Sequence, residues 1–166
     1  LKPISSQARG GGYFSLWGLS TSYFVNQIYL PLTQGGREKE VSIYDSMFPL
    51  ASMDLYFHLY GKKGFIEYQV LIPDSSVAEY LKQIENILLQ NRAPTLMVAM
   101  RLFKGEQKFL RFNGSGLSLT IDMPRNKEVA ALLPLLDELS LDLSSLPYII
   151  KNSHLDSKSV KQLYPE

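Results

Sequence analysis

The sequence predicts an α+β domain in which two helices cover one face of an antiparallel sheet. Its regular segments follow the order β-α-β-β-α-β, the split β-α-β or ferredoxin-like arrangement. Segments with alternating polar and apolar residues predict the strands, and Leu- and Ile-rich segments with helical spacing predict the helices. Because 166 residues with 45% hydrophobic content can bury one sizeable core, we expect one such domain with an N-terminal helical arm.

The first half of the domain is a predicted strand, helix and strand. The first strand covers Phe65–Ile72, where polar residues occupy alternate positions. The helix covers Ser75–Gln90, and either Asp74 or Ser75 is expected to cap its free N–H groups. The strand Thr95–Phe103 then completes the first half.

The second half repeats this pattern with the strand Leu117–Met123, the helix Asn126–Leu143 and the strand Leu146–Ile150. Pro134 lies inside the helix. Because proline lacks a main-chain N–H, we expect it to kink or shorten that helix.

Two shorter elements are predicted outside this core. Val41–Tyr44 alternates and predicts a short strand, whereas Asp156 can cap a terminal helix over Ser157–Leu163.

Residues 1–40 are expected to form the helical arm and a mobile loop, and residues 41–166 the domain itself. Trp17, Phe24 and Ile28 recur at the spacing of an amphipathic helix. Their apolar face would pack on this domain; the alternatives are a further domain or a membrane surface.

Composition excludes several classes of function. The net charge is +1, with 17 basic and 16 acidic residues and no long run of one sign, which argues against nucleic-acid binding. The absence of cysteine excludes disulfides, thiolate nucleophiles and Cys-ligated metals. The two histidines, His58 and His154, lack metal-ligand spacing, so we expect no metal. No apolar run reaches the roughly 20 residues that a membrane span needs.

The sheet face that the helices leave uncovered is the best candidate for a binding site. Alternation places polar side chains there, namely those of Glu67, Gln69, Arg101, Ser118, Thr120 and Asp122. The Gln69 amide offers a donor and an acceptor to a sugar hydroxyl or a flavin edge. The alternative is that Gln69 makes a cross-strand hydrogen bond or faces solvent.

Lys151 follows the apolar run of the last predicted strand, with Tyr148 close by. A partly buried lysine would set a fixed positive charge against an anionic ligand or a reduced flavin. The alternative is a lysine that ends its strand in solvent.

Four motifs occur in an order typical of one enzyme family. They are Phe65 with Tyr68-Gln69, Arg101-Leu102-Phe103, Leu119-Thr120-Ile121-Asp122-Met123-Pro124 and Tyr148-Ile149-Ile150-Lys151-Asn152-Ser153. In this order they resemble the substrate domain of FAD-linked oxidoreductases of the vanillyl-alcohol oxidase superfamily, in the decaprenylphosphoryl-β-D-ribose 2′-oxidase branch.

This resemblance implies a substrate (cap) domain that covers the flavin of FAD, which a separate FAD-binding domain of the same parent chain would hold. It implies Tyr148 and Lys151 as catalytic residues, with Gln69 and Arg101 facing the cavity. The chemistry would be hydride transfer from an alcohol carbon of a sugar or polyprenyl-linked sugar to flavin N5. It further implies a cytoplasmic enzyme, with the inner face of the membrane as a place of contact, and an isolated chain that is inactive.

The sequence departs from that branch at several positions. Glu67 stands where the branch has glutamine, and Thr120 occupies a position that can be cysteine there; Asn152 and His154 replace aspartate and arginine. We therefore expect a different sugar, sugar alcohol or polyprenyl-linked glycan as substrate.

Two other classes of protein fit the same element order, because a fold does not determine a function. One is a non-catalytic ferredoxin-like module that binds a ligand or regulates a partner. The other is an RNA-binding sheet, which the neutral charge and the lack of paired aromatic residues on central strands disfavour.

Overall fold

The computed structural model describes residues 60–95, 97–108, 111–151 and 154–164, together with 18, 20, 21, 23, 24, 27, 28, 32 and 40–44. The chain divides into two units, Leu1–Gly64 and Phe65–Glu166. The boundary expected between residues 40 and 41 falls inside the first unit.

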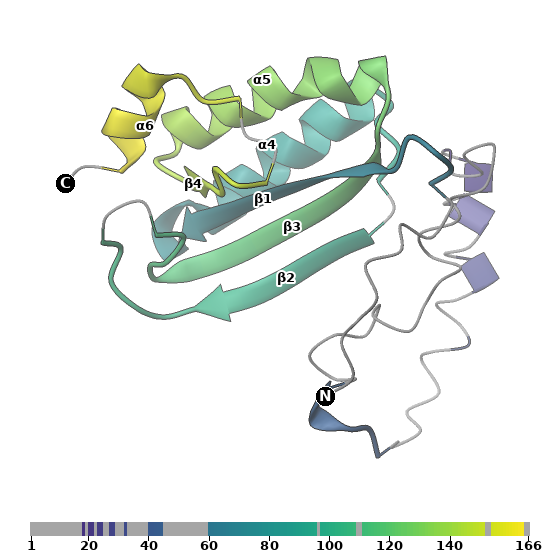
Figure 1. Ribbon diagram of the computed structural model, residues 1–166, viewed down its shortest axis with the longest axis horizontal. Helices are drawn as coiled ribbons and strands as arrows, with labels where there is room; N and C mark the ends of the chain where they lie inside the picture. Colours follow the sequence, from purple (N-terminus) through teal and green to yellow (C-terminus); the bar gives the residue numbers. More distant parts are fainter. Residues whose placement is uncertain are drawn as a thin grey trace. The chain divides into compact units, whose positions relative to one another are not determined.

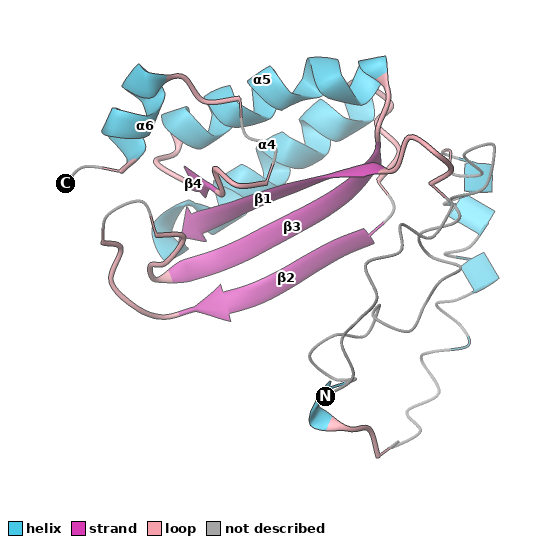
Figure 2. Ribbon diagram, in the orientation of Figure 1, coloured by secondary structure: helices cyan, strands magenta, loops and turns pink. Residues whose placement is uncertain are grey.

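The second unit contains the predicted α+β core, which confirms the fold class. Its elements are β1 (Phe65–Pro73), the 3₁₀ helix η1 (Asp74–Ser76), α4 (Val77–Gln90), β2 (Met97–Phe103), β3 (Gly116–Pro124), α5 (Lys127–Asp142), β4 (Leu146–Pro147) and α6 (Ser157–Leu163). Figure 1 shows α4 and α5 side by side on one face of the sheet. Figure 2 separates the helical layer from the strands by colour.

The four strands form one antiparallel sheet in the order β2-β3-β1-β4. The longest pairing joins β1 to β3, from Phe65 opposite Pro124 to Pro73 opposite Gly116. By contrast, β4 pairs with β1 through two residues only. The two central strands, β1 and β3, therefore carry most of the face on which a site can be built.

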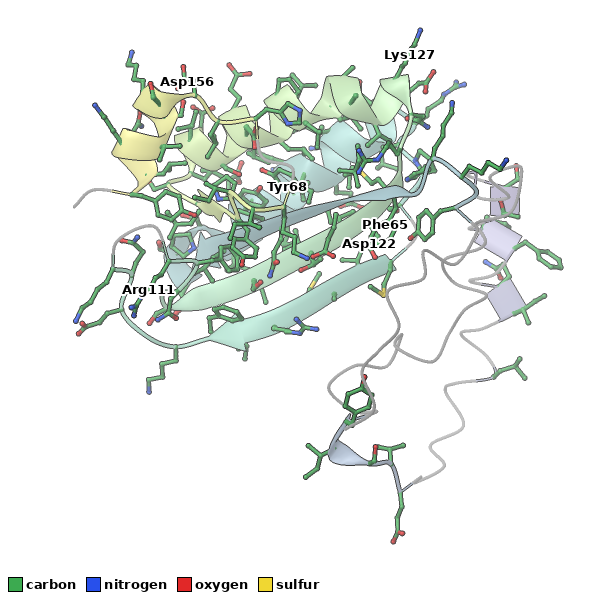
Figure 3. The ribbon with its side chains drawn as sticks, in the orientation of Figure 1. Phe65, Tyr68, Arg111, Asp122, Lys127 and Asp156 are labelled. Carbon is green, nitrogen blue, oxygen red and sulfur yellow. The ribbon has the colours of Figure 1, made fainter. Side chains whose placement is uncertain are left out.

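Alternation along β1 and β3 separates a core face from an open face. The core-facing residues of β1 are Ile66, Tyr68, Val70 and Ile72, and they pack with Leu119, Ile121 and Met123 of β3 against α4 and α5. Figure 3 shows Tyr68 among the side chains between the sheet and the helices. Because side chains alternate along a strand, the intervening residues of β1 face the other way.

The helices protect the edge strand β2 less than the central strands. Val98, Met100 and Leu102 pair with the core-facing residues of β3 and with Leu117. Even so, they are 48%, 55% and 85% exposed.

Three hydroxyl groups form a buried cluster between the sheet and the helices. The Tyr68 hydroxyl donates to the Leu136 carbonyl at 2.9 Å and lies 3.0 Å from Ser140 Oγ, which is 2.9 Å from the Tyr80 hydroxyl. Burial raises the pKa of Tyr80 to about 12 and raises the pKa of Tyr68 well above its ordinary value. The cluster thus satisfies the polar tips of two large core residues.

The first helix begins later than predicted. Asp74 and Ser75 form the 3₁₀ turn η1, and Ser76 occupies the N-cap position of α4 without a side-chain hydrogen bond. Neither of the two expected capping residues therefore caps α4, because the 3₁₀ turn occupies the space between Pro73 and the helix.

The second helix passes through Pro134 without ending, so the prediction that proline shortens it is wrong. A proline at this position leaves the carbonyl of Ala130 without its usual N–H donor. Both residues are exposed, and water can hydrate that carbonyl. At the start of the helix, Asn126 accepts a hydrogen bond from the Val129 N–H at 2.7 Å, as an N-cap residue does.

The last strand is shorter than predicted, whereas the terminal helix is confirmed. β4 ends at Pro147, because the chain turns when the Lys151 N–H donates to the Tyr148 carbonyl at 2.8 Å. Asp156 caps α6 by accepting from the Ser159 N–H at 2.8 Å.

In the first unit, Trp17 lies outside the described residues, while Phe24 and Ile28 are helical and exposed. The strand expected at Val41–Tyr44 is wrong: Ile43 and Tyr44 are helical. A four-residue alternation is too short to distinguish a strand from a helical turn. Within the described part of the chain, no helix has both the length and the apolar character needed to cross a membrane.

Candidate functional site

The strand register assembles the predicted polar residues on the open face, which we define as the sheet face turned away from α4 and α5. Glu67 lies opposite Asp122, and Gln69 lies opposite Thr120. Ser118 lies between Leu71 of β1 and Arg101 of β2. Alternation alone therefore predicted the composition of this face correctly.

Gln69 and Ser118 are joined across the two central strands. The Gln69 Nε2 atom donates to Ser118 Oγ at 3.2 Å, and Ser118 is only 1% exposed. Of the two readings of Gln69, the structure thus shows the cross-strand hydrogen bond. This bond holds the Gln69 amide against Ser118, and a role of Gln69 in ligand binding stays a prediction.

Lys151 does not end its strand alone in solvent. Its Nζ atom lies 3.0 Å from Glu67 Oε1, and the two side chains are 38% and 26% exposed. The pair links the segment after β4 to Glu67 near the start of β1. It holds an ammonium group at the border of the open face.

Tyr148 is held beside Gln69 by the main chain. Its N–H donates to the Gln69 carbonyl at 2.7 Å, which extends the β4 to β1 pairing by one residue. The residue before Tyr148, Pro147, is also held: its carbonyl accepts a hydrogen bond from the buried Tyr164 hydroxyl at 2.7 Å. Burial, with a contribution from Tyr148, raises the pKa of Tyr164 to about 12.

An aromatic border, formed by Phe103, Phe112 and Tyr148, runs along this part of the site. The Phe112 ring stacks on Tyr148 with centroids 4.8 Å apart and planes at 28°. It meets Phe103 edge to face at 5.8 Å and 72°. Phe112 was missed by sequence reasoning, because it lies in the β2 to β3 connection and no local periodicity shows that it folds back over Tyr148.

Arg101 shares the open face but lies on the edge strand β2 and is exposed. The structure therefore brings Glu67, Gln69, Tyr148 and Lys151 together and leaves Arg101 at the rim.

A cavity of about 290 Å³ opens at one end of the site. Leu71 and Leu146, which are paired across β1 and β4, line it together with Pro73, Gly105, Gly114 and other residues. Its lining carries no charged residue and combines apolar side chains with the polar side chains of Gln107, Ser115 and Ser144. Sequence reasoning did not find it, because its walls come from segments that are distant along the chain.

The donor set fits the ring of a flavin or a polyol better than a metal. Among the described residues, no group of three or more histidine or acidic residues is placed to hold a metal ion. The Lys151 ammonium and the Gln69 amide instead offer partners for hydroxyl groups, and the stacked rings of Phe112 and Tyr148 offer a surface for a flat ring.

Comparison with curated proteins relates the chain to the oxidoreductases. One relative is the decaprenylphosphoryl-beta-D-ribose oxidase of Mycolicibacterium smegmatis, which is 25% identical over 129 residues. The match covers 78% of this chain but only 28% of the length of that relative. No family model matches the chain. This similarity and the sequence motifs both relate the chain to the oxidoreductases.

Proposed function

We propose that the chain is the substrate-binding domain of an FAD-dependent oxidoreductase that oxidises an alcohol carbon of a sugar or polyprenyl-linked sugar. The observation that carries the proposal is the convergence of Lys151, Glu67, Gln69 and Tyr148 beside the stacked Phe112. The similarity to an oxidase supports it independently.

Several side chains of the open face have a role in this proposal. Gln69 and Thr120 would bind and orient the hydroxyl groups of the sugar, and the buried Ser118 would hold the Gln69 amide in place. The aromatic border would pack against a flat face of the sugar or the flavin. FAD, when bound, would supply the acceptor for the hydride.

The charged pair would control the electrostatics of the site. Lys151 would set its ammonium near the negative charge that the flavin gains as it accepts the hydride, and the proton of the alcohol hydroxyl would pass to solvent. Glu67 would keep that ammonium in place when the ligand is absent.

The proposal needs a further domain to hold most of the cofactor. The open face can contact a ring, and the described residues offer no glycine-rich loop that leads into a helix to hold the pyrophosphate of FAD. We therefore propose an FAD-binding domain of the same parent chain as partner. The uncharged cavity lined in part by Leu71 and Leu146 would take a further part of the substrate.

The test is the visible absorption spectrum of the protein purified in its natural full length. We expect flavin absorption, and we expect it to bleach without oxygen when the correct sugar, sugar alcohol or polyprenyl-linked sugar is added. A colourless protein that takes up no added FAD would overturn the oxidoreductase proposal. It would favour the non-catalytic ligand-binding module, for which sugar-induced NMR shifts on the open face are the positive test.

A further inference from the structure

The position of Lys151 depends on a short segment with little regular structure of its own. The segment Tyr148–Lys151, here called the site segment, leaves the sheet after only two residues of β4 pairing. At its start, the Tyr148 N–H and the Pro147 carbonyl are both bonded. At its end, the Lys151 N–H bonds back to Tyr148. These bonds tie the start of the segment to Gln69 of β1 and to Tyr164.

The described part of the chain shows one anchor just beyond the site segment. The main-chain N–H of His154 donates to Asp137 Oδ2 at 2.9 Å. Asp137 belongs to α5, so this bond ties the chain three residues after Lys151 to the helical layer. The two residues are 17 positions apart in the sequence, and the bond is therefore a tertiary contact.

Burying the Asp137 carboxylate costs stability. Asp137 is 5% exposed on the inner side of α5, and its Oδ1 atom makes no hydrogen bond among the described residues. A buried carboxylate with one unbonded oxygen costs free energy that an apolar side chain of similar shape would not. Burial raises the pKa of Asp137, whereas His154 and Tyr68 lower it. The Asp137 charge in turn raises the pKa of Tyr68 and of Tyr80.

We propose that Asp137 is a positioning residue: by accepting the His154 N–H it anchors the far side of the site segment and thereby sets where the Lys151 ammonium lies beside Glu67. The anchor itself is independent of any ligand. Its consequence for turnover rests on the proposed function, because only that function uses Lys151.

Asp137→Leu separates anchoring from stability. Leucine branches at the same atom as aspartate and removes the buried charge, so we expect the free energy of unfolding to be kept or raised. His154 is exposed, and its freed N–H can bond water. We expect hydrogen exchange of the His154 amide to accelerate about ten- to hundredfold, the range that corresponds to a hydrogen bond to a charged group. Amides of Val70 and Ile121 in the central strands should keep their protection.

Three matched variants sharpen the measurement. Asp137→Asn keeps an oxygen acceptor and should retain most of the protection at His154. His154→Ala keeps the main-chain N–H and should also retain it. Glu138→Ala removes an exposed carboxylate next to Asp137 on α5 and should change nothing.

The kinetic arm uses the flavin-loaded full-length protein. Asp137→Leu should slow flavin reduction by about tenfold, and the double variant with Lys151→Met should be no slower than Lys151→Met alone, because both changes act through one ammonium group. Unchanged exchange at His154 in Asp137→Leu, or an equal loss of protection at every amide, would overturn the anchor. If hydrogen exchange at His154 responds to Asp137→Leu as expected but the full-length protein contains no flavin, only the proposed function is overturned.

Discussion

Lys151 Nζ and Glu67 Oε1 lie 3.0 Å apart and join the segment after β4 to the central strand β1. Both side chains are partly exposed, at 38% and 26%, and exposed pairs contribute little to stability. The pair is therefore better explained by the placement of a charge than by the stability of the fold.

Glu67→Gln should change the free energy of unfolding by no more than about 1 kcal/mol, because the pair is screened by solvent. Denaturant unfolding of the isolated chain measures this directly. A loss of about 3 kcal/mol or more, as breaking a fully buried pair would produce, would show that the two charges are structural.

Gly116→Ala should destabilise the domain by about 2 kcal/mol or more. Gly116 has a φ of 151°, and a Cβ there would overlap the Ile72 carbonyl oxygen on the neighbouring strand. Gly64→Ala is the matched control: its φ is 68°, but a Cβ there meets nothing within 4 Å. Gly64→Ala should lower the free energy of unfolding by only about 1 kcal/mol, because alanine must adopt the left-handed conformation. Equal losses in the two variants would rule out the clash at Ile72.

The stability of the domain should carry a pH dependence that comes from Asp137. Burial raises the pKa of this carboxyl, and this outweighs the lowering by the His154 N–H. Between the ordinary carboxyl pKa and the higher folded-state pKa, the folded state therefore binds more protons than the unfolded state. Its contribution to stability is complete below the ordinary pKa and is lost as the pH rises through the folded pKa. Relative to wild type, Asp137→Asn should thus gain stability with rising pH in that window, as measured by urea unfolding at a series of pH values. If the stability of Asp137→Asn relative to wild type instead falls as the pH rises through that window, a raised pKa is contradicted.

The hydroxyl cluster predicts a second, alkaline dependence. Burial raises the pKa of Tyr80 to about 12, so the folded state keeps a proton that the unfolded state loses near pH 10. Stability should fall as the pH rises from about 10 toward 12. Tyr80→Phe should reduce this fall and cost about 1 kcal/mol at neutral pH for the lost hydrogen bond to Ser140. Tyr23→Phe, at an exposed position, is the control. An unchanged alkaline slope in Tyr80→Phe would contradict this account.

The long elements could be predicted from the sequence because their periodicity is strong and their ends carry clear signals. Strand β1 and helix α6 agree with the prediction to within one residue, since Pro73 and Asp156 mark a boundary in each case. The errors lie where tertiary context decides. A proline is tolerated in α5 because its face is exposed, and β4 is short because the chain turns at Tyr148.

The composition of the open face could also be predicted, because a period of two fixes which residues share a face. The ion pair of Lys151 with Glu67, the stacking of Phe112 on Tyr148 and the anchor at Asp137 could not. Each joins residues from different elements, and their contact depends on the sheet order and on loops that have no periodic pattern. The roles of Lys151, Tyr148, Gln69, Glu67, Arg101, Ser118 and Thr120 in catalysis or binding stay predictions.

The central claim is that the open face is the flavin and substrate site of an oxidoreductase, and the rate of flavin reduction by substrate in the full-length protein tests it most directly. Lys151→Met should lower that rate by about tenfold or more, because it removes a fixed charge from the reacting centre. Lys158→Met, at an exposed position on α6, should leave it unchanged. If both variants reduce flavin at the wild-type rate, or if the protein binds no flavin at all, the claim is contradicted.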